Sequence, residues 1–100
     1  MGTMQLRRYW FEPGHLGAFR DWFPTLLAAR EQYGFRVLFA LAEPRHEAFT
    51  WAVELDGDVD AFLGLEARWN DSPERAAAFE TWHGRVARTE IGFVEDDLRS

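Results

Sequence analysis

Aromatic side chains with polar neighbours are the feature of this 100-residue chain that points most directly to chemistry. Several tryptophans come from different predicted elements, and an arginine, a tyrosine and an asparagine are predicted to lie near them. Rings with a few polar groups at the rim form the usual pocket for a flat apolar molecule. Core and dimer-interface packing also enriches tryptophan, and we favour packing as the simpler interpretation. The candidate ligand-binding residues are Arg7, Tyr9, Trp22, Trp51, Trp69, Asn70 and Trp82.

The other polar side chains give no catalytic or metal-binding pattern. His15, His46 and His83 are too far apart in sequence to show the i, i+4 spacing of helical metal ligands. Alternating carboxylates in residues 56–60 lack the remaining positions of a calcium loop, and a turn followed by a helix N-cap explains them. Phosphate loops, serine elbows and dinucleotide fingerprints are missing. We therefore expect no metal and no cofactor, and no catalytic residue can be assigned.

Arg7 lies on a predicted strand among aromatic residues and has two interpretations. On the strand face shared with Tyr9, its guanidinium could reach into a cavity and bind a carboxylate or an enolate. The commoner arrangement is an ion pair across the sheet, with Glu54 or Glu90 as the partner. The sequence leaves both open.

Composition excludes several classes of function. The formal net charge of −6 argues against nucleic-acid binding, because phosphate contacts need a basic surface. No apolar run approaches the roughly 20 residues of a membrane span, and no signal-peptide pattern opens the chain. The chain has no cysteine, which fits a cytoplasmic protein. We expect one domain over residues 1–100.

Strands and helices alternate in the order strand, helix, strand, strand, helix in two pieces, strand. Apolar residues at spacings of three and four mark the first helix, and this series ends at Arg30. Pro24 falls inside it and predicts either a kink or two helical pieces. In the second strand, Phe35, Val37, Phe39 and Leu41 alternate with their neighbours. The expected strands cover residues 4–11, 35–42, 48–55 and 89–94, and the expected helices cover residues 16–33, 59–69 and 73–84.

This order predicts an α+β, ferredoxin-like βαββαβ fold with a four-stranded antiparallel sheet and helices on one face. The other face would carry large apolar residues such as Trp10, Phe39 and Trp51. A monomer cannot leave that much apolar area exposed to water, so two sheets are expected to pack face to face. The predicted assembly is a homodimer, a dimeric α+β barrel.

Four short segments follow one another along the chain: residues 6–9 ahead of Pro13-Gly14, residues 30–35, residues 49–51, and residues 70–74 followed by Phe79. In these segments and their order, the chain resembles the NIPSNAP family of dimeric α+β barrel proteins from about Met4 to Val94. The resemblance implies a homodimer with a cavity between sheet and helices, and it supplies no catalytic residues. The wider superfamily includes antibiotic-biosynthesis monooxygenases and haem-degrading oxygenases, but the chain departs from the haem-degrading pattern.

We therefore expect a NIPSNAP-like homodimer that binds a small apolar or aromatic ligand or a partner protein. The alternative is a cofactor-independent, monooxygenase-like enzyme acting on an aromatic substrate. A third possibility is a structural module with a filled core. An open cavity lined by Arg7, Trp51 and Trp82 would favour the first two, and a packed interior would favour the third.

Overall fold

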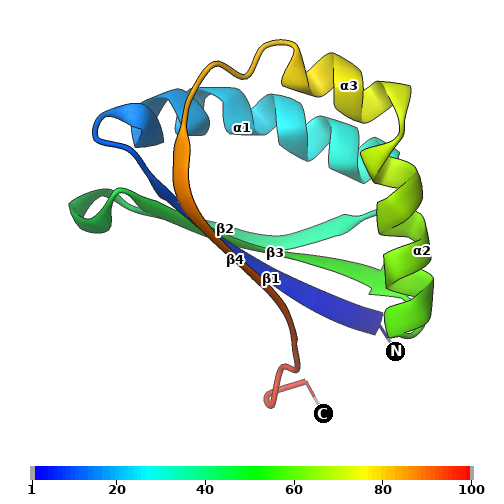
Figure 1. The fold of residues 1–100 in the computed structure, drawn as a ribbon. Helices are drawn as coiled ribbons and strands as arrows, with labels where there is room; N and C mark the ends of the chain where they lie inside the picture. Colours follow the sequence, from blue (N-terminus) through cyan, green and yellow to red (C-terminus); the bar gives the residue numbers. More distant parts are fainter. Residues whose placement is uncertain (1, 100) are drawn as a thin grey trace.

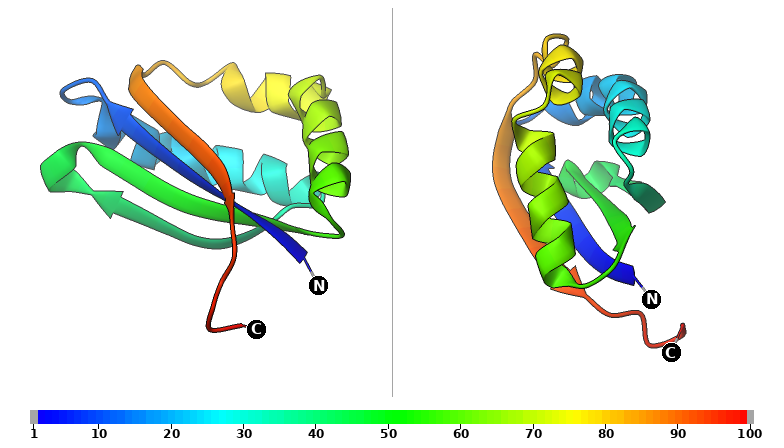
Figure 2. Two further views of the ribbon diagram at one scale, coloured as in Figure 1. Left: turned by 60° about the horizontal axis from the view of Figure 1, so that its bottom comes forward. Right: turned by 90° about the vertical axis from the view of Figure 1, so that its right-hand side faces the viewer.

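One antiparallel sheet with helices on one side forms the structure, a computed structural model that describes residues 2–99. The helices α1 and α3 lie over one face of the sheet, and α2 stands at one end of the layer between them (Figure 1, Figure 2). The elements are β1 (Gly2–Phe11), α1 (His15–Gln32), β2 (Arg36–Glu43), a short 3-10 helix (Pro44–His46), β3 (Ala48–Asp56), α2 (Val59–Asn70), α3 (Pro73–Phe79) and β4 (Val86–Val94).

The strand order is β2-β3-β1-β4, with every neighbouring pair antiparallel. This is the ferredoxin-like arrangement, so the predicted α+β fold is confirmed. The largest differences from the predicted boundaries are in β4 and α3. β4 begins at Val86, three residues before the expected start, and α3 ends at Phe79. The N-cap of α3 is as expected, because the Ser72 hydroxyl accepts the Arg75 N–H at 3.1 Å.

Helix α1 runs without a break from His15 to Gln32, with Pro24 inside it. Of the two alternatives predicted from Pro24, a kink or two helical pieces, the second is therefore wrong. Proline removes one backbone hydrogen bond, but Pro24 is exposed, so water can satisfy the carbonyl that it leaves free. Packing of the opposite side of the helix, including buried Phe19 and Phe23, keeps the helix in one piece.

The two central strands present alternate residues to the helices. Arg7 of β1 pairs with Trp51 of β3 on the helix-covered face, and Leu6 pairs with Ala52 on the opposite face. Trp51 was expected on the uncovered face, and that prediction is wrong. Its ring is fully buried, 5.3 Å from the ring of Phe23 in α1. Side chains alternate between the two faces along β3, and residues 49, 51 and 53 all point toward the helices.

A β-bulge in β2 places residues that alternate regularly in the sequence on different faces of the sheet. Val37 pairs with Val53 on the helix-covered face, and the register then shifts so that Phe39 pairs with Ala52. The extra residue, Leu38, moves Phe39 and Leu41 to the uncovered face. Their side chains are 39% and 57% exposed. We call this uncovered side of the sheet the open face; its residues are Met4, Leu6, Arg8, Trp10, Arg36, Phe39, Leu41, Glu43, Ala48, Thr50, Ala52, Glu54, Arg88, Glu90, Gly92 and Val94.

Candidate functional site

An arginine lies inside the aromatic core. Arg30 follows Leu26 by one helical turn on the apolar side of α1, so the helix directs it inward, and it is only 3% exposed. Its Cζ atom lies 4.8 Å from the ring centroid of Phe35, 5.4 Å from that of Trp51 and 5.0 Å from that of Trp69. Three rings from different elements thus surround one cation.

Two nitrogens of this guanidinium have no hydrogen-bond acceptor among residues 2–99. They are Nε and Nη1 of Arg30, and the buried Trp51 Nε1 also has none there. Buried donors are nearly always paired, because an unpaired one loses its bonds to water and gains nothing. Three unpaired donors around Arg30 and Trp51 therefore mark a place suited to an acceptor from outside the chain.

Arg7 supplies a second cation beside this position. Its Nε donates to the Tyr9 hydroxyl at 2.7 Å, and its Nη1 donates to Gln5 Oε1 at 2.8 Å. The carboxylate of Glu66 in α2 lies 3.4 Å from the same Nη1, which is long for an ion pair. The guanidinium carbon lies 5.7 Å from the centroid of the Trp51 ring. These residues and Arg30 form the interior cluster, defined as Gln5, Arg7, Tyr9, Arg30, Trp51 and Glu66.

Burial lowers the pKa of Arg30 from its ordinary value to about 9. Desolvation is the largest cause, and the positive charges of Arg7 and, less strongly, Arg75 act in the same direction. Tyr9 and Glu66 oppose it. Arg30 remains protonated at neutral pH, so the interior holds a cation that the surrounding residues stabilise poorly.

The candidate tryptophans fall into two groups. Trp51 and Trp69 surround Arg30, whereas Trp22 and Trp82 stack at the other end of α1 with ring centroids 5.1 Å apart. The Trp22 Nε1 donates to the Ala78 carbonyl at 2.9 Å and to the Thr81 hydroxyl at 3.0 Å. This second group ties α1 to the end of α3, and Trp22 has the partners that Trp51 lacks.

The remaining polar residues singled out in the sequence lie away from the interior cluster or have structural contacts. Asn70 is exposed at the C-terminal end of α2. His15 Nδ1 accepts the Arg85 backbone N–H at 2.9 Å and so fixes the approach to β4. Arg7 was expected to pair with Glu54 or Glu90, but its carboxylate partner is Glu66.

Glu54 and Glu90 have other arginine partners on the open face. Glu54 is bound by Arg36 at 3.1 Å and by Arg99 at 2.9 Å, and Glu90 pairs with Arg88. Hydrogen bonds from Arg99 and then Arg36 lower the pKa of Glu54, and burial partly opposes them. These carboxylates sit on the other side of the sheet, so they cannot reach Arg7.

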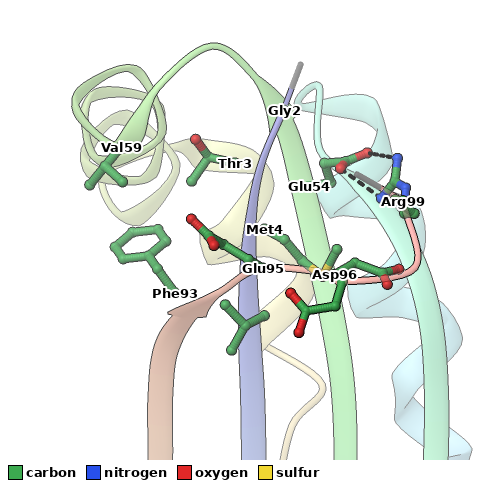
Figure 3. Close-up of a pocket in the computed structure, with 11 residues that line it drawn as sticks. Gly2, Thr3, Met4, Glu54, Val59, Phe93, Glu95, Asp96 and Arg99 are labelled. Atoms are coloured by element: carbon green, nitrogen blue, oxygen red, sulfur yellow. Dashed lines mark hydrogen bonds and ion pairs between the residues drawn. The ribbon is translucent and has the colours of Figure 1, made fainter.

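Two pockets among the described residues lie outside the interior cluster. One of about 690 Å³ lies where β1 begins, beneath the C-terminal residues (Figure 3). Met4, Glu54 and Val94 line it, and the Glu54–Arg99 ion pair closes one side. The other, of about 570 Å³, lies over Leu6 and neighbouring residues of β4. Neither is lined by Arg7, Trp51 or Trp82, so the two pockets do not supply the predicted cavity.

Within residues 2–99, no group of three or more histidine and acidic side chains could hold a metal ion. None of the helices in this range combines the length and apolar character needed to cross a membrane.

Solved structures resemble the chain over nearly its whole length. An uncharacterised NIPSNAP domain protein from Burkholderia xenovorans superposes with a TM-score of 0.79 at 16% identity, covering 96% of this chain and 94% of its own. A NIPSNAP family protein from Agrobacterium tumefaciens gives 0.81 at 7% identity, with 95% and 92% covered. A Bacteroides thetaiotaomicron protein, provisionally described as an antibiotic biosynthesis monooxygenase, gives 0.72 at 16% identity, with 96% and 90% covered.

Sequence comparison adds no closer relationship: no family model matches the chain, and no curated protein matches it. The architecture defines the class, a ferredoxin-like α+β fold that these solved structures share. Within that class, the NIPSNAP resemblance seen in the sequence is confirmed at the level of the fold. Identities of 7–16% show the fold alone.

The sequence analysis missed the residue at the centre of the cluster. Arg30 belongs to the apolar series of α1, and a charged residue inside such a series was the available signal. Glu66 was likewise not predicted as a site residue. No sequence pattern could show that α2 directs it toward Arg7, because that contact joins residues 59 positions apart.

Proposed function

We propose that the protein is a homodimeric α+β barrel domain that binds one small, flat, largely apolar molecule inside each protomer. The site is the interior cluster, between the helix-covered face of β1 and β3 and the helices above it; neither of the two pockets lies there, so the ligand would have to open the cluster as it binds. The observation that carries this proposal is Arg30, a buried cation held among three rings without an acceptor for two of its nitrogens. A purely structural core would gain stability from an apolar residue at this position.

Apolar groups on the open face support the homodimer. Met4, Leu6 and Trp10 lie along its central strand, and Phe39 and Leu41 extend the surface to the edge. Exposed apolar surface of this kind marks an interaction site. A second copy would offer the same apolar surface, as a two-fold symmetric interface requires, and each sheet would cover the other. A different partner protein is the competing occupant.

Native mass spectrometry of the purified protein tests both parts of this proposal. The expected spectrum shows a dimer carrying extra mass that disappears when the same sample is denatured. A monomer at micromolar concentration would overturn the homodimer. A dimer without added mass after incubation with a panel of flat aromatic compounds would overturn ligand binding and favour the filled structural module.

A cofactor-independent monooxygenase acting on an aromatic substrate is the second candidate. Arg7, Arg30 and the Tyr9 hydroxyl are groups that stabilise a phenolate, and relatives in fold carry the monooxygenase description. Oxygen consumption on addition of a polycyclic phenol would support the enzyme. Binding of the phenol without oxygen consumption would support the ligand-binding domain alone.

A further inference from the structure

We infer that the ligand is a monoanion, an oxyanion such as a carboxylate attached to a flat apolar body, and that Arg30 with the Trp51 indole N–H binds its charged end. This inference rests on the proposed function and specifies the chemical class of the ligand. Three observations support it: the donors that have no acceptor, the excess positive charge of the cluster and the position of Glu66.

The unpaired donors set the kind of group that would fit. Arg30 offers Nε and Nη1, whose N–H bonds leave the guanidinium along different edges, and Trp51 offers Nε1 from a ring whose centroid is 5.4 Å from the Arg30 Cζ atom. All three are donors, so the missing partner must be an acceptor. A carboxylate has two acceptor oxygens, and hydrogen bonds from a guanidinium to it are charge-assisted. It would accept from one free edge of Arg30 and leave its second oxygen for the Trp51 indole N–H.

Charge favours an anion over a neutral acceptor. The interior cluster contains two guanidinium groups, Arg7 and Arg30, and a single carboxylate, Glu66. The cluster therefore carries one excess positive charge in a poorly solvated place. A monoanion would neutralise it, whereas a neutral carbonyl or hydroxyl group would leave the excess charge in place.

Glu66 marks the side from which the ligand would approach. The side chains of Arg7 and Glu66 keep 14% and 19% of their surface exposed, while Arg30 is almost fully covered. The 3.4 Å separation of Arg7 and Glu66 is loose, so little energy holds Glu66 in place. Displacement of Glu66 toward solvent would open a path to Arg30. Glu66 would then compete with the anion for the two arginines.

A matched pair of probes tests the inference. Isothermal titration calorimetry compares 2-naphthoate with 2-naphthalenemethanol, which has the same ring system and a neutral hydroxymethyl group. We expect wild-type protein to bind 2-naphthoate at least tenfold more tightly than the alcohol. Arg30→Met should reduce this preference to less than twofold. Arg20→Met, an exposed position on the same helix, is the control and should keep the preference.

Glu66→Gln gives an independent measurement that does not require a change in the core. Removing the competing carboxylate should tighten 2-naphthoate binding several-fold and leave the alcohol unchanged. Equal binding of the two probes to the wild type, or a preference that survives in Arg30→Met, would overturn the anionic ligand while leaving ligand binding intact. Failure of both probes to bind would overturn the proposed small-molecule function and this inference with it.

Discussion

Arginines on the two sides of the sheet differ in whether they have carboxylate partners. On the open face, Arg8, Arg36 and Arg88 each have a carboxylate partner, and so does Arg99 of the C-terminal segment. On the helix-covered side, Arg7 has a loose partner in Glu66, and Arg30 has none among residues 2–99, although it is the most buried of the six. Burial increases the need for a partner, so the pairing is the reverse of what stability alone would produce.

This difference indicates separate roles for the two faces. A face whose charges are already neutralised can be covered by another protein sheet without leaving buried unpaired ions, and the apolar side chains between the pairs supply the attraction. An unpaired cation enclosed by rings suits a small anion that arrives and leaves. Functional sites commonly keep residues that lower the stability of the fold.

Trp51→Ala should have the largest effect, because it removes one of the largest fully buried side chains, on the helix-covered face of the sheet. Trp51 is fully buried and contacts both Tyr9 and Phe23. Replacing a buried tryptophan with alanine costs about 3–5 kcal/mol of folding free energy. Urea denaturation followed by circular dichroism would measure the loss.

Trp10→Ala is the matched substitution on the open face. Trp10 is half-buried and stacks between Arg8 and Arg88, with guanidinium carbons 4.6 and 4.4 Å from its ring. We expect a smaller loss of unfolding free energy and a larger effect on dimerisation than for Trp51→Ala.

If Trp51→Ala cost less than about 1 kcal/mol of folding free energy, the interpretation of a tightly packed core around Arg30 would be wrong.

Most of the fold was predictable, since it depends on local patterns. Alternation located all four strands, and the Ser72-Pro73 signal began α3 at the right residue. The face of the sheet on which Trp51 lies was not predictable. Both faces of the strands carry bulky residues, and alternation alone does not say which face the helices cover. The bulge at Leu38 was also hidden, because one inserted residue leaves no local signature.

The candidate site was predictable only in part. Arg7, Tyr9, Trp51 and Trp69 were chosen for ring and charge character, and the fold brings them around one position. Arg30 was missed because an arginine at the end of an apolar helical series usually extends its charge to solvent. Its burial results from packing against β3 and α2, which sequence spacing cannot show.

Leu41→Glu tests the open face as a dimer interface and should have the second-largest effect. Leu41 is 57% exposed in the protomer, so the substitution should leave the fold intact. A carboxylate buried without a partner between two sheets should weaken dimerisation by about 2–5 kcal/mol. Light scattering should then show a monomer at concentrations where the wild type is a dimer.

Leu63→Glu is the control for this substitution. Leu63 is 47% exposed on α2, outside the sheet. This variant should remain dimeric. Dissociation of both variants would indicate general destabilisation, and a dimeric Leu41→Glu protein would place the interface elsewhere.

Arg30→Met should have the smallest effect, and its sign distinguishes a functional arginine from a structural one. Burial lowers the pKa of Arg30 to about 9, so the folded state holds its proton less tightly than the unfolded state. The resulting destabilisation is fully present below pH 9 and decreases as the pH rises toward the unfolded value. Ligand-free Arg30→Met should therefore be more stable than the wild type by about 1 kcal/mol at pH 7.

The advantage of Arg30→Met should shrink between pH 8 and pH 10.5, as the wild-type guanidinium loses its proton in the folded state. Thermal unfolding of both proteins across this range would show converging melting temperatures, whereas the exposed Arg20→Met control should differ from the wild type by a constant amount. Arg7, Tyr9, Glu66 and Arg75 also face Arg30, and the comparison holds them fixed. A variant less stable than the wild type at pH 7 would mean that contacts with the rings outweigh desolvation, and Arg30 would then be a structural residue like its paired counterparts on the open face.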